Sequence, residues 1–301
     1  MIVKFTDLKD KIGKVKRGEI KEGLSLGIKE IDEYFRFKPS DFGIILGRAN
    51  VGKTTMVIYL MLLYSLKHDI RWLVFSSENE AYSLVKKLAE FMEGLVIYQI
   101  ADDTLEARLE WINKHFKIIN SENLYTYRDL LKEAEEIKKA WDYQGFLIDP
   151  YNSLIKDAQL LKQGGGHEYD YQAASEMRIF CKKNQVSIWL NAHAATDSLR
   201  RVFPKEHEYA GLPMPPNMSD IEGGGKWSNR SDFFCIIDRM TQHPTDWMYT
   251  NIHITKIKDT DTGGRPTSID SPIRMRSVPD NVGFAIDGKN IIHQLNSPIC
   301  S

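Results

Sequence analysis

Short apolar runs and longer amphipathic segments alternate along most of the chain. The short runs, rich in β-branched and aromatic residues, are typical of strands, whereas the longer segments repeat apolar residues every three or four positions, as helices do. Strands are expected at Phe42–Leu46, Trp72–Phe75, Phe116–Ile119, Gly145–Ile148, Ser187–Leu190, Phe233–Ile237, Asn251–Lys256 and Gly283–Ile286. Helices are expected at Thr54–Leu66, Glu80–Phe91, Thr104–Asn113, Tyr127–Trp141 and Tyr169–Lys183. This alternation predicts an α/β fold whose mostly parallel, twisted sheet is flanked by helices.

Two domain-level segments differ in pattern. Residues 1–23 are rich in Lys and Glu and contain glycines but little apolar periodicity, so they are expected to form an N-terminal arm or linker that could reach a neighbour in an oligomer. Residues 24–301 carry the alternating pattern and are expected to form one domain. Within it, Gly164–Gly166 and the proline- and glycine-rich segment 195–226 are expected to be loops, and long loops in a compact fold usually bind something.

The composition favours a globular enzyme over a membrane or disulfide-rich protein. The chain has 301 residues, 42% of them hydrophobic, and a net charge of −1. It has no apolar run of about 18 residues and no signal-like N-terminus, so a cytoplasmic location without membrane contact is expected. Cys181, Cys235 and Cys300 lack metal-binding spacing and are expected to be reduced thiols. Because the charge is balanced, any nucleic-acid contact should be made by local loops.

A phosphate-binding motif follows the first predicted strand. Gly47 to Thr54 read G-x-x-x-x-G-K-T, between an apolar strand and an apolar helix. The glycines let backbone N–H groups converge on phosphates, while Lys53 supplies positive charge and Thr54 a hydroxyl for Mg²⁺. ATP and Mg²⁺ are therefore the expected ligands, and the residues expected to bind them in this loop are Gly47, Asn50, Gly52, Lys53, Thr54 and Thr55.

Polar residues end three further apolar runs. Asp149 ends Phe146–Asp149 and is expected to hold Mg²⁺ with Thr54. Glu78 follows the strand after the phosphate loop, where a general base could activate water, although an acid favoured at a helix N-terminus or the competing Glu80 would also fit the pattern. Asn191 or His193 could contact the γ-phosphate, because ligands bind at the carboxyl ends of strands in open α/β sheets.

Taken together, these motifs resemble the hexameric replicative helicases of the DnaB type, which have a RecA-like core. The resemblance covers about residues 20–290 and is greater to the Twinkle and phage primase–helicase branch than to the bacterial enzymes. The order of the family motifs assigns catalytic roles to Lys53, Glu78 and His193, and the branch usually has His at this last position. A primase or collar domain preceding the core in that branch is not found here, so assembly is expected to rest on the core and the arm.

Two downstream segments extend the resemblance. Pro215–Trp227, with Ser231-Asp232 and Asp238-Arg239 after it, looks like the family's fourth motif, a channel-facing loop leading to a core strand. Thr255–Gly263 is similar to the family's K-x-R element, whose basic residues reach the nucleotide of the neighbouring subunit; here they are Lys256 and Lys258.

Lysine at position 258 departs from the family's arginine finger. Lysine supplies charge without the planar fork of a guanidinium. Three explanations remain open: Lys258 acts as a weaker finger, Arg239 or Arg265 takes the role, or activation between subunits is reduced.

Candidate DNA contacts lie in the long loop. Arg200, Arg201 and Lys205 could track successive phosphates of a single strand, and Lys226 in the glycine-rich part is a second candidate. A basic segment is also typical of a solvated turn. No aromatic cluster is evident in these loops, which favours backbone tracking over base stacking.

The resemblance implies an ATP-dependent ring, a hexamer, that translocates on single-stranded DNA and unwinds forked duplex by hydrolysing ATP at subunit interfaces. A separate primase or polymerase is an expected partner, and the short core leans towards a phage source, with host cytoplasm as its location. Two alternatives remain: a RecA- or RadA-like recombinase or annealing ATPase, and an ATP-gated DNA scaffold or loader with weak hydrolysis.

Overall fold

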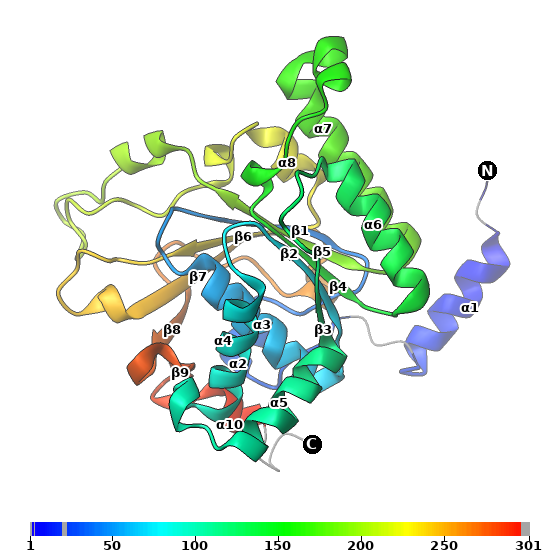
Figure 1. Cartoon of the computed structure of the whole chain (residues 1–301). Helices are drawn as coiled ribbons and strands as arrows, with labels where there is room; N and C mark the ends of the chain where they lie inside the picture. Colours follow the sequence, from blue (N-terminus) through cyan, green and yellow to red (C-terminus); the bar gives the residue numbers. More distant parts are fainter. Residues whose placement is uncertain (1, 3, 20–22, 296–301) are drawn as a thin grey trace.

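Ten strands form one sheet at the centre of the computed structural model, which describes residues 2, 4–19 and 23–295 (Figure 1). Six neighbouring strands run parallel, in the order β6 (Phe233–Asp238), β1 (Phe42–Gly47), β5 (Ser187–His193), β4 (Gly145–Asp149), β2 (Trp72–Ser76) and β3 (Phe116–Ile118). The others continue antiparallel beyond β6, as β7 (Tyr249–Ile257), β8 (Ile273–Ser277), β9 (Phe284–Ile286) and β10 (Lys289–Asn290). The expected α/β fold with a mostly parallel sheet is confirmed.

Helices cover both faces of the sheet. One face packs against α2 (Lys29–Asp32), α3 (Lys53–His68), α4 (Ala81–Glu93), α5 (Asp102–His115) and α10 (Ile291–Leu295), and the other against α6 (Tyr127–Ala140), α7 (Ala158–Asn184) and α8 (Gly225–Arg230). The short α9 (Thr260–Gly263) follows β7. Residues of β1 alternate between the two cores: Ile45 packs with α3, whereas Ile44 and Leu46 face α7. Burial on both faces explains why the parallel strands read as continuous apolar runs.

All of the expected strands are present, with boundaries shifted by at most a few residues, but β8 and β10 were not predicted from the sequence. In β8 the alternation is clear once its position is known, because Ile273 and Met275 are buried while Arg274 and Arg276 are exposed. A short strand with two arginines carries a weak apolar signal, and its pairing with β7 supplies what the local sequence lacks.

The expected loop at Gly164–Gly166 is wrong. These glycines lie inside α7, which begins near Ala158 rather than at Tyr169 and has non-helical geometry only at Gly165, with φ 70° and ψ 176°. Asp157 caps the helix start by accepting hydrogen bonds from the N–H groups of Gln159 and Leu160, which offsets part of the cost of glycine in a helix.

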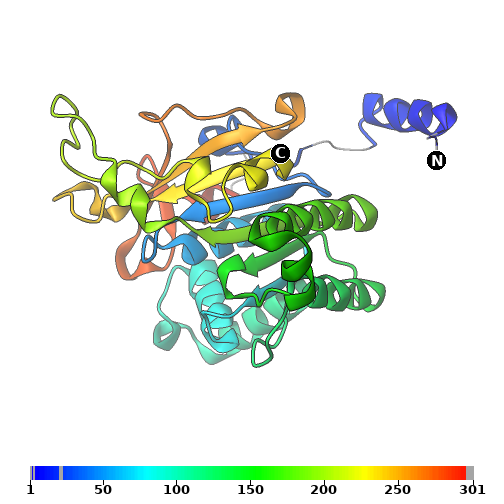
Figure 2. The ribbon, with the colours of Figure 1, turned by 90° about the horizontal axis from the view of Figure 1, so that it is seen from above.

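The N-terminal segment contains a helix, α1 (Phe5–Lys16), none of whose residues is buried. Figure 2 shows α1 set apart from the body of the molecule. Its role as an arm remains a prediction. In the part of the chain that the structure describes, no helix has the length and apolar character needed to cross a membrane. Cys181 and Cys235 are buried free thiols, as expected, and Cys300 lies outside the described residues.

Candidate functional site

The ends of four parallel strands meet where the phosphate-binding loop was predicted. In the register of the sheet, Gly47 of β1 lies level with His193 of β5, and Ser76 of β2 lies level with Asp149 of β4. The residues predicted separately from strand ends are therefore brought to one edge. Glu78 follows β2 by two positions and joins them.

The loop itself has the backbone geometry that its sequence requires. Gly52 has a φ of 80° and Asn50 a φ of 61°, both in the left-handed region that glycine and asparagine tolerate best. Gly47 is needed for space, because a Cβ there would lie 2.7 Å from the carbonyl oxygen of Ile237. Thr55, in the first turn of α3, is half-buried.

Lys53 and the start of α3 place positive charge at this edge. The Lys53 ammonium group is buried and donates to the Gly47 carbonyl at 3.4 Å. Burial lowers the pKa of Lys53, while the nearby Asp149 and Glu78 oppose that shift. The first turn of α3 contains no acidic residue that would neutralise the positive end of its dipole. Such a site suits an anion with several oxygens, the property expected for phosphates.

Thr54 and Asp149 form the pair predicted to hold Mg²⁺. The Thr54 hydroxyl donates to Asp149 Oδ2 at 2.8 Å, and Asn191 Nδ2 donates to Asp149 Oδ1 at 2.7 Å. Burial raises the pKa of the Asp149 carboxyl, and the hydrogen bonds from Asn191 and Thr54 act in the opposite direction. A hydroxyl and a carboxylate are hard oxygen ligands of the kind that Mg²⁺ prefers, so the residues fit this cation.

Asn191 and His193 are separated by the strand alternation. Asn191 is fully buried and orients Asp149, whereas the His193 ring is partly exposed and its Nε2 lies 3.1 Å from Glu78 Oε1. Of the two residues that the sequence left open for contact with a terminal phosphate, only His193 is at the open edge beside Glu78. Glu80, the competitor of Glu78, precedes α4 as its N-cap residue.

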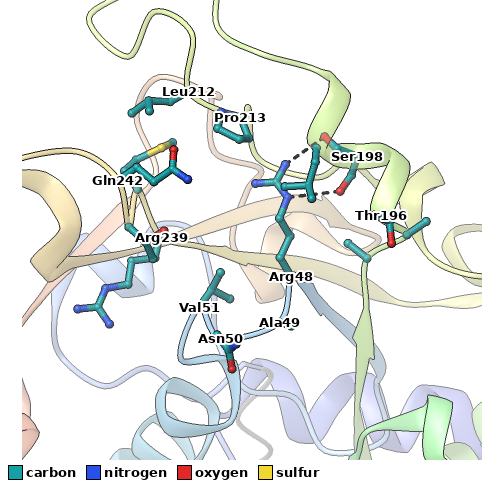
Figure 3. Close-up of a pocket in the computed structure, with 15 residues that line it drawn as sticks. Arg48, Ala49, Asn50, Val51, Thr196, Ser198, Leu212, Pro213, Arg239 and Gln242 are labelled. Carbon is teal, nitrogen blue, oxygen red and sulfur yellow. Dashed lines mark hydrogen bonds between the residues drawn. The ribbon is translucent and has the colours of Figure 1, made fainter.

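Arg48, which sequence reasoning treated as an unspecified loop position, links this loop to distant segments. Its side chain points toward Ser198 along one wall of a cavity of about 340 Å³ (Figure 3). Nε donates to Ser198 Oγ at 3.3 Å and Nη2 to the Ser198 carbonyl at 3.2 Å, while Nη1 lies 3.3 Å from Asp238 Oδ1. Nη2 also donates to the carbonyl of Met214. Only the arginine between the two glycines of the motif hinted at this role.

The predicted trans-acting lysines lie on β7 and just beyond it. Lys256 donates to the carbonyls of Ser228 and of Ser231, the latter at 2.7 Å, and burial lowers its pKa. Lys258 is exposed, with its Nζ 3.7 Å from Asp232 Oδ1. Lys258 is thus the more accessible of the two, and contact of Lys256 with another subunit would require these carbonyl contacts to break.

The two alternative fingers are differently placed. Arg239 donates from Nε to the Trp247 carbonyl, lies over the Trp247 ring and lines the cavity beside Arg48. Arg265 pairs with Glu33 and lies over the Tyr34 ring. Both contacts are within the chain, and their roles toward a neighbour remain predictions.

The candidate DNA residues are not equally available. Arg200 has 83% of its side chain exposed and pairs weakly with Asp197 at 3.3 Å, and Lys205 is also exposed. Arg201 instead forms an ion pair with Asp220, and Lys226 is half-buried.

The expectation that these loops lack an aromatic cluster is wrong. Phe203, His207 and Tyr209 pack together, with the Phe203 and His207 rings stacked 4.3 Å apart. Because Phe203 is buried, this cluster holds the loop in shape and leaves little of that ring for base stacking.

Comparisons with known proteins agree with the fold. The chain superimposes on a solved helicase-type ATPase domain with a TM-score of 0.71 at 14% identity, covering 93% of this chain and 97% of that one. A DnaB-like replicative helicase, described with its interactions with primase, gives a TM-score of 0.69 at 13% identity, covering 95% and 67%. The KaiC-like protein PH0186 of Pyrococcus horikoshii OT3 gives 0.53 at 13%, covering 88% and 97%.

No curated protein sequence matches the chain significantly. The family model of the DnaB-like helicase C-terminal domain, in contrast, matches residues 23–268, which is most of the chain. This chain therefore belongs to the DnaB-like helicase C-terminal domain family.

Proposed function

We propose that this chain is the ATP-hydrolysing motor of a ring-shaped replicative helicase that translocates on single-stranded DNA and unwinds forked duplex. The observation that carries the proposal is the convergence of Lys53, Thr54, Glu78, Asp149 and His193 at one edge of the sheet, in a member of the DnaB-like family. The assembly proposed is a homo-hexamer in the cytoplasm, with a separate primase or polymerase as partner. The phage and Twinkle branch is favoured by histidine at position 193.

Each residue of the site has a proposed role. Lys53 and the N–H groups at the start of α3 would bind the terminal phosphates of ATP, and Thr54 with Asp149 would hold Mg²⁺. When bound, Mg²⁺ supplies positive charge to the phosphate oxygens. Glu78 would take a proton from the attacking water, and His193, 3.1 Å away, would orient the Glu78 carboxylate.

Completion of the site by a neighbour is also part of the proposal. Lys258 is exposed and tied only by a long ion pair to Asp232, so it is free to reach an adjoining subunit at small cost. A point charge there would stabilise the charge that develops on the transferred phosphoryl group. Hydrolysis should therefore depend on assembly.

Strand separation tests the proposal. A forked DNA duplex with one labelled strand is incubated with the purified protein, Mg²⁺ and ATP, beside the Lys53→Ala variant. Separation by wild type that requires ATP and is lost in the variant is the expected result. ATP hydrolysis without any separation would contradict the helicase assignment for the chain alone and favour a recombinase-like activity.

A further inference from the structure

The segment 201–214 is built as a single loop with a narrow base. Its two ends are joined by the hydrogen bond from Met214 N to the Arg201 carbonyl at 2.8 Å, and the next step inward by one from Phe203 N to the Leu212 carbonyl at 2.9 Å. The aromatic cluster defined above fills its interior. The loop projects beyond the carboxyl ends of the strands (Figure 2), so it can move as one body about its base.

Arg48 holds both sides of that base. On one side it donates to the side chain and carbonyl of Ser198, just before the loop, and on the other to the carbonyl of Met214. Ser198 is buried, and only 14% of the Arg48 side chain is exposed. Hydrogen bonds from a charged donor in such a site are stronger than neutral ones, and the planar guanidinium fork is what allows one group to serve several acceptors.

A buried carboxylate fixes the guanidinium from behind. Asp238, at the end of β6, is fully buried and lies 3.3 Å from Arg48 Nη1. The backbone of Arg48 belongs to the same loop as Lys53, and Gly47 beside it accepts a hydrogen bond from Ala194 N at 3.1 Å. A shift of the phosphate-binding loop by a bound nucleotide would therefore move the guanidinium against Ser198 and Met214.

We propose that Arg48 is a positioning residue that couples the nucleotide state of the phosphate-binding loop to the loop 201–214. That loop and the residue before it carry Arg200, Arg201 and Lys205, so the coupling would change how these cations face single-stranded DNA. This inference rests on the proposed function for its DNA partner, whereas the mechanical link between the two loops stands on the contacts of Arg48.

Replacement by lysine tests the link while keeping a positive charge beside Asp238. Arg48→Lys retains the charge but loses the fork, and Arg128→Lys, in the surface ion pair with Glu176, is the matched control. The affinity for an oligothymidylate is measured by fluorescence anisotropy with and without a non-hydrolysable ATP analogue. In wild type and in the control the analogue should change this affinity on the order of tenfold, and in Arg48→Lys by less than about twofold.

Two results would overturn the proposal. One is a response to the analogue in Arg48→Lys equal to that of wild type. The other is loss of analogue binding itself in that variant, because Arg48 would then be a direct nucleotide ligand. A merely destabilised variant would instead lower its unfolding temperature without altering the ratio of the two DNA affinities, which also counts against the proposal.

Hydrogen exchange separates failure of this inference from failure of the proposed function. The amides of Phe203, Gly211 and Met214 are hydrogen-bonded at the loop base and report its opening. Their exchange should be faster by about tenfold in Arg48→Lys and should respond to the analogue in wild type alone. If wild type binds no DNA but shows this pattern, the helicase proposal fails and the link stands; unchanged exchange in Arg48→Lys overturns the link.

Discussion

His193 Nε2 lies 3.1 Å from Glu78 Oε1, joining the ends of β5 and β2, which are separated in the sheet by β4. Neither residue is held by a strong ion pair to another side chain, and Glu78 is about half exposed. The pair therefore faces the open edge next to Lys53, where an incoming water molecule and a terminal phosphate would have to meet. This position distinguishes Glu78 from an acid that only caps a helix.

Replacing Glu78 by Gln should lower ATP hydrolysis by about 100-fold or more, since the amide cannot accept the proton of the attacking water. ATP should remain bound, and retention of labelled ATP on the protein measures this. Glu80→Gln, two residues away at the N-cap of α4, is the control and should hydrolyse ATP at close to the wild-type rate. Undiminished hydrolysis in Glu78→Gln would move the base to another residue.

Removing Lys258 should reduce turnover by at least about 100-fold while leaving nucleotide affinity nearly intact, because its charge would act on the site of a neighbour. Equilibrium binding of a fluorescent ATP analogue and steady-state hydrolysis are measured on Lys258→Ala, with Lys258→Arg as the charge-conserving control.

Mixing variants makes that test specific. Lys53→Ala subunits still carry Lys258, and Lys258→Ala subunits still carry a phosphate-binding loop, so mixed assemblies should regain part of the activity that each lacks alone. Absence of any recovery, or loss of nucleotide binding in Lys258→Ala, would exclude action between subunits and leave Arg239 or Arg265 as candidates.

Asp238 should give the protein a recognisable pH dependence. Burial raises the pKa of its carboxyl to about 6 from 3.8. Because the folded-state pKa is the higher one, the stabilisation is fully present below about pH 4 and is lost as the pH rises through 6. Relative to Asp238→Asn, wild type should lose on the order of 2 to 3 kcal/mol of unfolding free energy between about pH 4 and pH 7.

The difference between the two proteins, measured by urea unfolding at each pH, is the appropriate readout. Burial lowers the pKa of His253 to about 4, which changes stability in the opposite sense over the same range and is present in both proteins. A difference that does not vary with pH would contradict the assignment of a protonated Asp238 in the folded state.

The exposed cations Arg200 and Lys205 should contribute to DNA affinity through phosphate contacts. Each contact removed by substitution with Ala should lower the slope of log affinity against log salt concentration by about 0.7 for a single strand. Lys183→Ala, an exposed lysine on α7, is the control and should leave the slope unchanged. An unchanged slope in Arg200→Ala and Lys205→Ala would identify the segment as a solvated turn.

The sequence was sufficient to predict the parallel strands and the residues at their ends, because a strand buried on both faces gives a continuous apolar run and ends where polar residues such as Asp149 and His193 appear. It did not predict β8, whose alternating pattern is short and basic, or the first half of α7, where glycines outweighed the cap at Asp157.

The Arg48 contacts could not be predicted for a different reason. They join positions 48, 198, 214 and 238, which are far apart in the chain and meet only when the sheet and the long loop are folded. The separate roles of Asn191 and His193 likewise depended on which face of β5 each occupies. Local patterns indicate which strand ends carry polar groups, and tertiary structure determines which of them touch.

The most direct test of the central claim is ATP hydrolysis by the purified protein with and without a single-stranded oligonucleotide, with Lys53→Ala in parallel. A motor that tracks a single strand should hydrolyse ATP, accelerate several-fold when the strand is added, and lose both activities in the variant. Negligible hydrolysis under every condition, or hydrolysis that the oligonucleotide and Lys53→Ala both leave unchanged, would contradict the assignment of this edge of the sheet as the site of a DNA-driven ATPase.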